Sequence, residues 1–154
     1  MEAKLKKAEY ACWDKSFSLI QRKEESRDAV VPDTQPDIAE VLFCAPTVLI
    51  RSKDVSPGRV KVEALINTRV LYRGEDSKIW SVELALPFFF SGEDEKISQE
   101  SIALARLNLL NTEARALNPR KILLRAELEA EISVFDPTKL SVCEGLLEPG
   151  QYRA

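Results

Sequence analysis

Four acidic side chains near expected turns are the first candidates for chemistry: Asp76, Glu93, Asp94 and Glu95. Two carboxylates that flank a substrate can act as acid and base in glycoside hydrolysis. Acids in turns, however, are more often solvated and bonded to nearby backbone amides. Residues 91–96 also lack the regular ligand spacing and central glycine of an EF-hand calcium loop. We therefore expect these acids to shape turns rather than to catalyse a reaction.

Histidine is absent from the 154 residues. Its absence excludes Ser-His-Asp and Cys-His catalysis, histidine-ligated zinc, copper or haem, and imidazole pH switching. The glycine-rich and nucleophile motifs GxGxxG, GxxxxGK[ST] and GxSxG are missing as well. The sequence therefore predicts that the protein is not an enzyme and holds no cofactor or metal.

The three cysteines, Cys12, Cys44 and Cys143, are odd in number and far apart, with no CxxC pair. This pattern is neither a disulfide framework nor a zinc site. One interpretation is that all three are small packed thiols of a reducing compartment. The other is that one of them forms an intermolecular crosslink after assembly in an oxidising setting.

The charge balance and the chain ends indicate a cytoplasmic protein that binds no nucleic acid. Lys and Arg number 22 against 25 Asp and Glu, a formal net charge of -3, without the basic patch that phosphate binding needs. The first ten residues lack the apolar core of a signal peptide. No apolar run approaches the ~20 residues of a membrane helix. We expect no membrane insertion.

Hydrophobic residues alternate with polar ones along three stretches, residues 60–72, 80–90 and 122–134. A period of two is typical of strands with one buried and one wetted face. The turn-forming residues 74–77 join the first two stretches, which predicts a hairpin. Residues 48–53 and 17–22 are expected to form shorter strands.

Two segments are harder to assign. Residues 98–118 favour helix by composition, but their alternation changes parity at Leu109-Leu110, as a β-bulge would produce, so we predict strand. Pro36 suits the first position of a helix, with Asp37 and Glu40 near its positive end. We therefore expect one short helix at residues 36–42.

Together these elements predict an all-β fold, an antiparallel β-sandwich that is jelly-roll-like or an open barrel. The expected organisation is an N-terminal arm at residues 1–15, a sandwich domain at 16–136 and a C-terminal arm or linker at 137–154.

Aromatic residues are the remaining candidates for a binding surface. Trp80, Phe88 and Phe90 share the parity of the expected core, whereas Phe89 should point outward. Tyr10 and Trp13 in the N-terminal arm are candidates of the same kind. Exposed aromatics suit a protein interface, or alternatively a sugar-binding face that stacks on peptidoglycan or another polysaccharide.

Residues 31–42, VPDTQPDIAEVL, resemble the signature of the SPOCS domain family, found in SipL-type spore morphogenesis proteins of endospore-forming Firmicutes. The signature positions are Pro32, Asp33, Pro36, Asp37 and Ile38. Further similar segments are Gly58-Arg59-Val60-Lys61-Val62, Val70-Leu71-Tyr72, Leu86-Pro87-Phe88 and Asn118-Pro119-Arg120-Lys121-Ile122. The resemblance covers residues 17–135.

The resemblance implies a non-catalytic module of the endospore envelope, made in the mother cell and placed in the spore coat or at the spore surface. Its partners would be further copies of itself and other envelope proteins. Docking onto a coat-anchoring ATPase is an alternative, but the LysM-like segment of SipL-type proteins is missing here. We expect a homo-oligomer or filament in which terminal arms complete the open sheet edges of neighbouring subunits.

Overall fold

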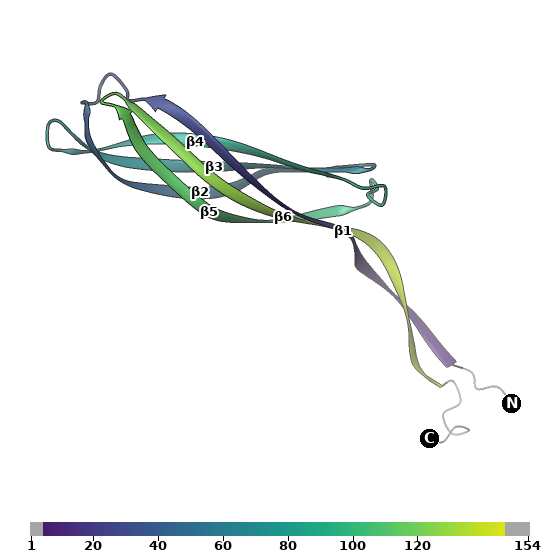
Figure 1. Cartoon of the computed structure of the whole chain (residues 1–154). Coiled ribbons are helices and arrows are strands. Elements are labelled where there is room, and N and C mark those ends of the chain that lie inside the picture. The colour runs from purple at the N-terminus through teal and green to yellow at the C-terminus, as the bar shows by residue number, and fades with distance from the viewer. Residues whose placement is uncertain (1–4, 147–154) are drawn as a thin grey trace.

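Six antiparallel strands form two three-stranded sheets that pack face to face as a β-sandwich (Figure 1). This computed structural model describes the backbone of residues 5–146 and the side chains of residues 8–141. The expected all-β sandwich is confirmed. The strands are β1 (Leu5–Val30), β2 (Ile38–Ser56), β3 (Arg59–Gly74), β4 (Ile79–Glu93), β5 (Ile102–Asn118) and β6 (Lys121–Leu146).

Each sheet has one central strand and two edge strands. Sheet A has the order β1-β6-β5 and sheet B the order β2-β3-β4, with every neighbouring pair antiparallel. At the two sides of the sandwich β1 lies beside β4, and β2 lies beside β5. No helix among the described residues has the length and apolarity that a membrane crossing needs.

The core is built from the residues whose alternation predicted it. Every second residue is buried along β3, from Val82 on β4, and from Ile122 to Val134 on β6, and the Phe88 and Phe90 rings stack with their centroids 6.3 Å apart. Burying one face of each sheet against the other removes apolar surface from water and drives the packing. The fully buried large side chains are Tyr72, Phe88, Phe90, Ile66, Leu86, Ile122, Leu124, Leu128, Ile132, Val31, Val60 and Val62.

Residues 98–118 contain a strand with a bulge where the sequence predicts one. Leu109 pairs with Leu128 and Asn111 with Glu127, so Leu110 is the additional residue. The bulge explains why the alternation changes parity at this point.

The helix expected at residues 36–42 is wrong. Strand β2 begins at Ile38, which pairs with Gly74, and Val41 pairs with Tyr72. A turn at residues 33–35 precedes it, closed by the Gln35 amide bonded to the Pro32 carbonyl at 2.9 Å. The local helix-start signal is overridden because one helical turn satisfies few backbone groups, whereas β3 offers partners to Ile38, Glu40 and Val41 and to the rest of β2 that follows.

The two terminal strands are much longer than expected, because β1 and β6 each contain 26 residues. Within the sandwich β6 pairs with both β1 and β5, but β5 begins only at Ile102, opposite Phe135. Residues 5–13 and 137–146 therefore pair only with each other and, together with the Asp14–Asp136 pair, form a two-stranded ribbon that projects from one end of the sandwich (Figure 1). A register shift between Lys15 and Phe17 marks the root of this ribbon.

Candidate interaction surfaces

The acidic residues near turns support the backbone. An Asp76 carboxylate oxygen accepts a hydrogen bond from the Lys78 amide at 3.1 Å, and the same carboxylate accepts one from the Trp80 indole. Asp94 accepts a hydrogen bond from the Lys96 amide at 2.8 Å. Within residues 8–141, whose side chains are described, no three Asp, Glu, Cys or His side chains lie close enough together to hold a metal ion.

The crossover from sheet A to sheet B, residues 31–38, is held by one guanidinium group. Arg120 Nη1 donates to the Gln35 carbonyl at 2.7 Å and to the Asp37 carboxylate at 3.2 Å. Its Nη2 donates to the carbonyls of Val31 and Pro32 at 3.1 and 3.0 Å. Four acceptors converge on one planar fork, a geometry that only arginine provides.

Backbone bonds join the crossover to the β5–β6 turn at both ends. The Val31 amide donates to the Arg120 carbonyl at 2.8 Å, and the Ile38 amide donates to the Pro119 carbonyl at 2.7 Å. The turn itself is closed by the Asn118 side chain, which accepts from the Arg120 amide at 2.8 Å. The crossover at residues 31–38 and the turn at residues 118–120 thus form one structural unit, although they are separated by about 80 positions in the sequence.

A tyrosine from the core holds the other side of the crossover. The buried Tyr72 hydroxyl donates to Gln35 Oε1 at 3.0 Å or to the Pro36 carbonyl at 3.1 Å. Burial raises the pKa of Tyr72 above its ordinary value, so the hydroxyl keeps its proton. Pro36 also packs so closely on Gly74 that a Cβ there would come within 2.6 Å of the proline ring.

Most of the signature residues therefore take part in the contacts that hold the crossover to Arg120 and to the core. The Pro32 carbonyl and the Asp37 carboxylate accept hydrogen bonds from Arg120, and Ile38 is buried at the start of β2. Asp33 is exposed, with its carboxylate 4.0 Å from the Arg120 guanidinium. They bridge the two sheets and form no pocket with a reactive group.

The cysteines are not brought together by the fold. Cys12 lies half-buried in the ribbon and Cys44 half-buried on β2, and both are free thiols. On the backbone Cys12 is opposite Thr138, whereas Cys143, whose side chain lies outside the described residues, is opposite Lys7.

Cys44 is expected to react slowly with alkylating reagents in the folded protein. Burial raises its pKa, which lowers the fraction of nucleophilic thiolate near neutral pH. A variant with only this cysteine (C12S/C143S) should be labelled by iodoacetamide more slowly at pH 7.5 than the same protein unfolded in urea. Equal rates under the two conditions would contradict the shielding of the thiol.

The three aromatic candidates are exposed, as expected, but they do not form one surface. Tyr10 and Trp13 lie on the ribbon with 49% and 53% of their surface exposed, and Phe89 lies on the outer face of sheet B at 59%. Tyr10 is opposite Leu140, and Trp13 is opposite Pro137. Because their positions differ by three, Tyr10 and Trp13 point to opposite faces of the ribbon. The arrangement is unlike a flat platform for stacking sugars.

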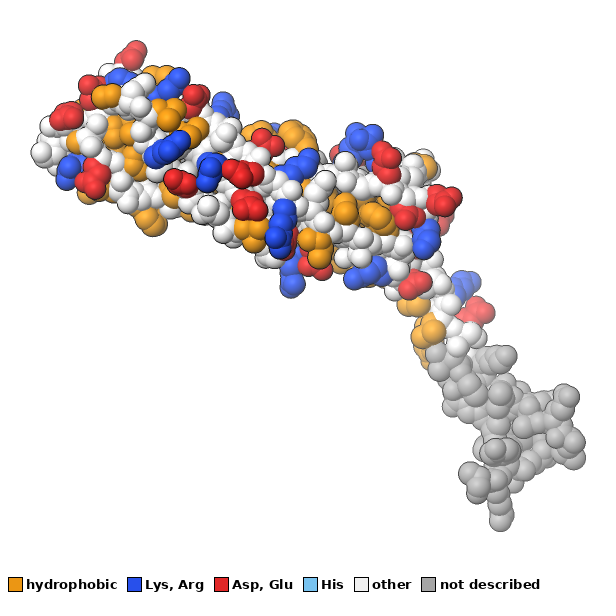
Figure 2. All heavy atoms as spheres, in the orientation of Figure 1, with side chains coloured by type: hydrophobic (Ala, Val, Ile, Leu, Met, Phe, Trp, Pro, Cys, Tyr) orange, Lys and Arg blue, Asp and Glu red, His pale blue; other side chains and the backbone are white. Residues whose placement is uncertain are grey.

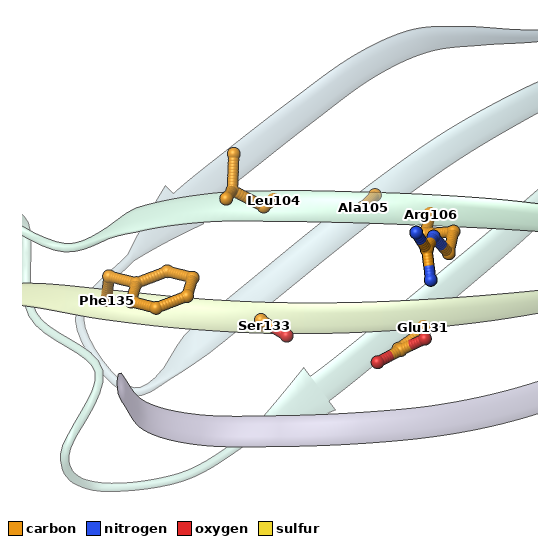
Figure 3. Close-up of a pocket in the computed structure, with 6 residues that line it drawn as sticks. All are labelled: Leu104, Ala105, Arg106, Glu131, Ser133 and Phe135. Atoms are coloured by element: carbon orange, nitrogen blue, oxygen red, sulfur yellow. The ribbon is translucent and has the colours of Figure 1, made fainter. Parts of the chain in front are cut away.

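A shallow hollow lies on the outer face of sheet A near the root of the ribbon. Figure 3 shows Leu104 and Phe135 at one end of it and Arg106 with Glu131 at the other. Its volume is about 150 Å³, too small and too open to enclose a substrate. Leu104 was not among the residues predicted to lie at a binding surface, although its even parity in residues 98–118 sets it apart from the core positions Ala103 and Ala105.

A larger open hollow of about 400 Å³ lies beside Phe89. Half of the residues that line it are charged: Lys23, Asp54, Arg59, Lys61 and Glu63. Figure 2 shows apolar side chains at the surface in separate groups, both on the body and at the start of the ribbon.

Comparison of the chain with models of known protein families, with curated proteins and with solved structures finds no match.

Proposed function

We propose that this chain is a non-enzymatic structural protein that assembles with copies of itself. The observation that carries the proposal is the projecting ribbon, in which Tyr10, Trp13 and Leu140 each expose about half of their surface. A two-stranded ribbon alone is marginally stable in water, because it buries little surface and leaves both edges unpaired. Contact with another subunit would cover these side chains and stabilise the ribbon.

We place the assembly in the bacterial endospore envelope, as a component of the spore coat or surface. This part of the proposal rests on the resemblance of residues 31–42 to the SPOCS signature. Other envelope proteins are then the natural further partners. The Arg120 contacts give the signature residues a role in holding the two sheets together, as expected for a module that serves as a rigid scaffold.

The proposal predicts that polar substitutions on the ribbon reduce the size of the purified particle. In Tyr10→Ser/Trp13→Ser/Leu140→Ser the apolar contact surface is lost, so the mass measured by light scattering should fall toward that of one chain, 17.4 kDa. Deletion of residues 1–13 should have the same effect.

The matched control is Ile79→Ser/Phe89→Ser, which removes two apolar side chains from the body that are more exposed than those of the ribbon, and it should leave the mass unchanged. Circular dichroism would verify that all variants keep their β-structure. A wild-type protein that has the mass of one chain at all concentrations, or ribbon variants that assemble as the wild type does, would refute the proposal.

A further inference from the structure

Most strand edges of the sandwich are protected against pairing with another chain, and β4 shows this most clearly. Pro87 removes one amide from its free edge. Three side chains donate hydrogen bonds to carbonyls along the same edge: Gln35 to Ser81 at 3.1 Å, Arg27 to Ala85 at 3.0 Å, and Lys23 to Phe89. Edges blocked in this way do not accept an additional strand.

The other edges carry interruptions of their own. Strand β2 contains Pro46 and three register shifts. Strand β5 has the bulge at Leu110 and lies beside β2. The edge of β6 that is left free beyond β5 begins with Pro137. Prolines and bulges are the usual means by which β-proteins prevent edge-to-edge association.

The ribbon part of β1 has none of these features. Residues 5–16 contain no proline and no glycine, and the ladder with β6 is regular from Lys7 to Lys15. No strand of the described chain pairs with the outer edge of this segment. From Lys7 to Lys15 this edge could accept a strand along its whole length, whereas the other regular part of the β1 edge, residues 17–30, lies on the side of the sandwich beside β4.

Resting on the proposed function, we propose that this edge pairs antiparallel with the same edge of a second copy, across a two-fold axis at Cys12. In this register Glu9 lies opposite Lys15 of the second copy, and the pair occurs twice by symmetry. Trp13 lies opposite the small Ala11, and the two indoles become diagonal neighbours. Opposite charges and aromatic contacts across strands both stabilise such pairs.

Neighbouring registers are less favourable. Moving the axis to Ala11 places Lys7 opposite Lys15 of the second copy, and like charges in direct opposition destabilise a sheet. Moving it to Trp13 leaves no pair of opposite charges. The Cys12 register joins two ribbons into a four-stranded sheet, which is stable where a two-stranded ribbon is marginal.

Cysteine crosslinking of the full chain tests this geometry. Cβ atoms directly opposite each other in an antiparallel pair are about 4.5–5.5 Å apart, close to the ~3.8 Å of a disulfide. In the Cys12-only variant (C44S/C143S), oxidation by dissolved oxygen with a copper catalyst should therefore give a covalent dimer; two thiols lose two protons and two electrons to oxygen. The Cys44-only variant (C12S/C143S) should remain a single chain.

Charge reversal gives an independent readout. Lys15→Glu replaces both attractive pairs by repulsive ones and should weaken dimerisation about tenfold in sedimentation experiments. Glu9→Lys/Lys15→Glu restores opposite charges across the axis and should recover the wild-type affinity. This double variant controls for the loss of contacts within one chain, namely Glu9 with Lys139 and Lys15 with Phe135.

The outcomes separate this inference from the proposed function. An oligomer that gives no Cys12 crosslink and is indifferent to Lys15→Glu overturns the edge pairing and leaves self-assembly standing. A covalent dimer obtained with Tyr10→Cys in a background without other cysteines, and not with Cys12, overturns the register. A single-chain mass at every concentration overturns both proposals.

Discussion

Replacement of Arg120 by alanine is expected to lower the free energy of unfolding by about 3 kcal/mol. The guanidinium makes four hydrogen bonds of 2.7 to 3.2 Å to the crossover and is only one-third exposed. Hydrogen bonds to a charged donor contribute more than neutral ones, and their loss leaves the carbonyls of Val31, Pro32 and Gln35 without this donor. Urea unfolding followed by circular dichroism would measure the change.

The matched control is Arg69→Ala on the exposed face of sheet B. Arg69 forms a surface ion pair with Glu83 at 2.8 Å, with both side chains more than 60% exposed. Exposed pairs contribute up to about 1 kcal/mol, so this variant should unfold near the wild-type midpoint. Similar losses in the two variants would show that Arg120 does not hold the crossover. Lys at position 120 should rescue only part of the stability, because an ammonium cannot serve the same fork of acceptors.

Phe88→Ala is expected to destabilise the protein by about 4 kcal/mol, because it opens a cavity in the middle of the core. The Phe88 side chain is fully buried and stacks on Phe90. Its neighbour Phe89 is 59% exposed on the opposite face of the same strand.

The adjacent substitution Phe89→Ala is the control for this prediction. Removing a mostly exposed ring should change the free energy of unfolding by no more than about 1 kcal/mol. Both variants replace Phe by Ala, at adjacent positions. The difference between their losses in free energy of unfolding therefore tests whether β4 buries every second residue. Equal effects would mean that β4 does not present alternate residues to the core.

The sandwich and the ribbon differ in how their strand edges are protected. Most edges of the sandwich are interrupted or covered by prolines, bulges and capping side chains, which are common means of preventing association through strand edges. The ribbon leaves one regular edge and several large apolar side chains accessible. Such a division allows association to be directed to one part of the surface.

Local pattern was sufficient for the parts of the fold in which side chains alternate over many residues. The core faces of β3, β4 and β6 follow directly from the parity of residues 60–72, 80–90 and 122–134. The bulge at Leu110 could be located because a change of parity has no other simple cause in a strand. The exposure of Phe89 followed from the same rule, since a strand must turn every second side chain away from its core.

The local pattern gave a wrong prediction at residues 36–42, where Pro36, Asp37 and Glu40 favoured a helix. Whether such a segment becomes helix or strand depends on whether β3 lies beside it, and that is a property of the tertiary structure. The length of β1 and β6 was also missed, because the ribbon residues show no clean alternation. Their extended conformation depends on pairing between the two ends of the chain.

By itself the sequence determined that histidine-dependent chemistry is excluded, which faces of the strands form the core, and that Phe89 points outward. It did so because residue type and a period of two are local properties. Only the tertiary structure decided that Arg120 meets the segment from Val31 to Asp37, and that the two ends of the chain form a ribbon with one unprotected edge. Those contacts join residues about 80 to 140 positions apart, and their partners are chosen by the packing of two whole sheets.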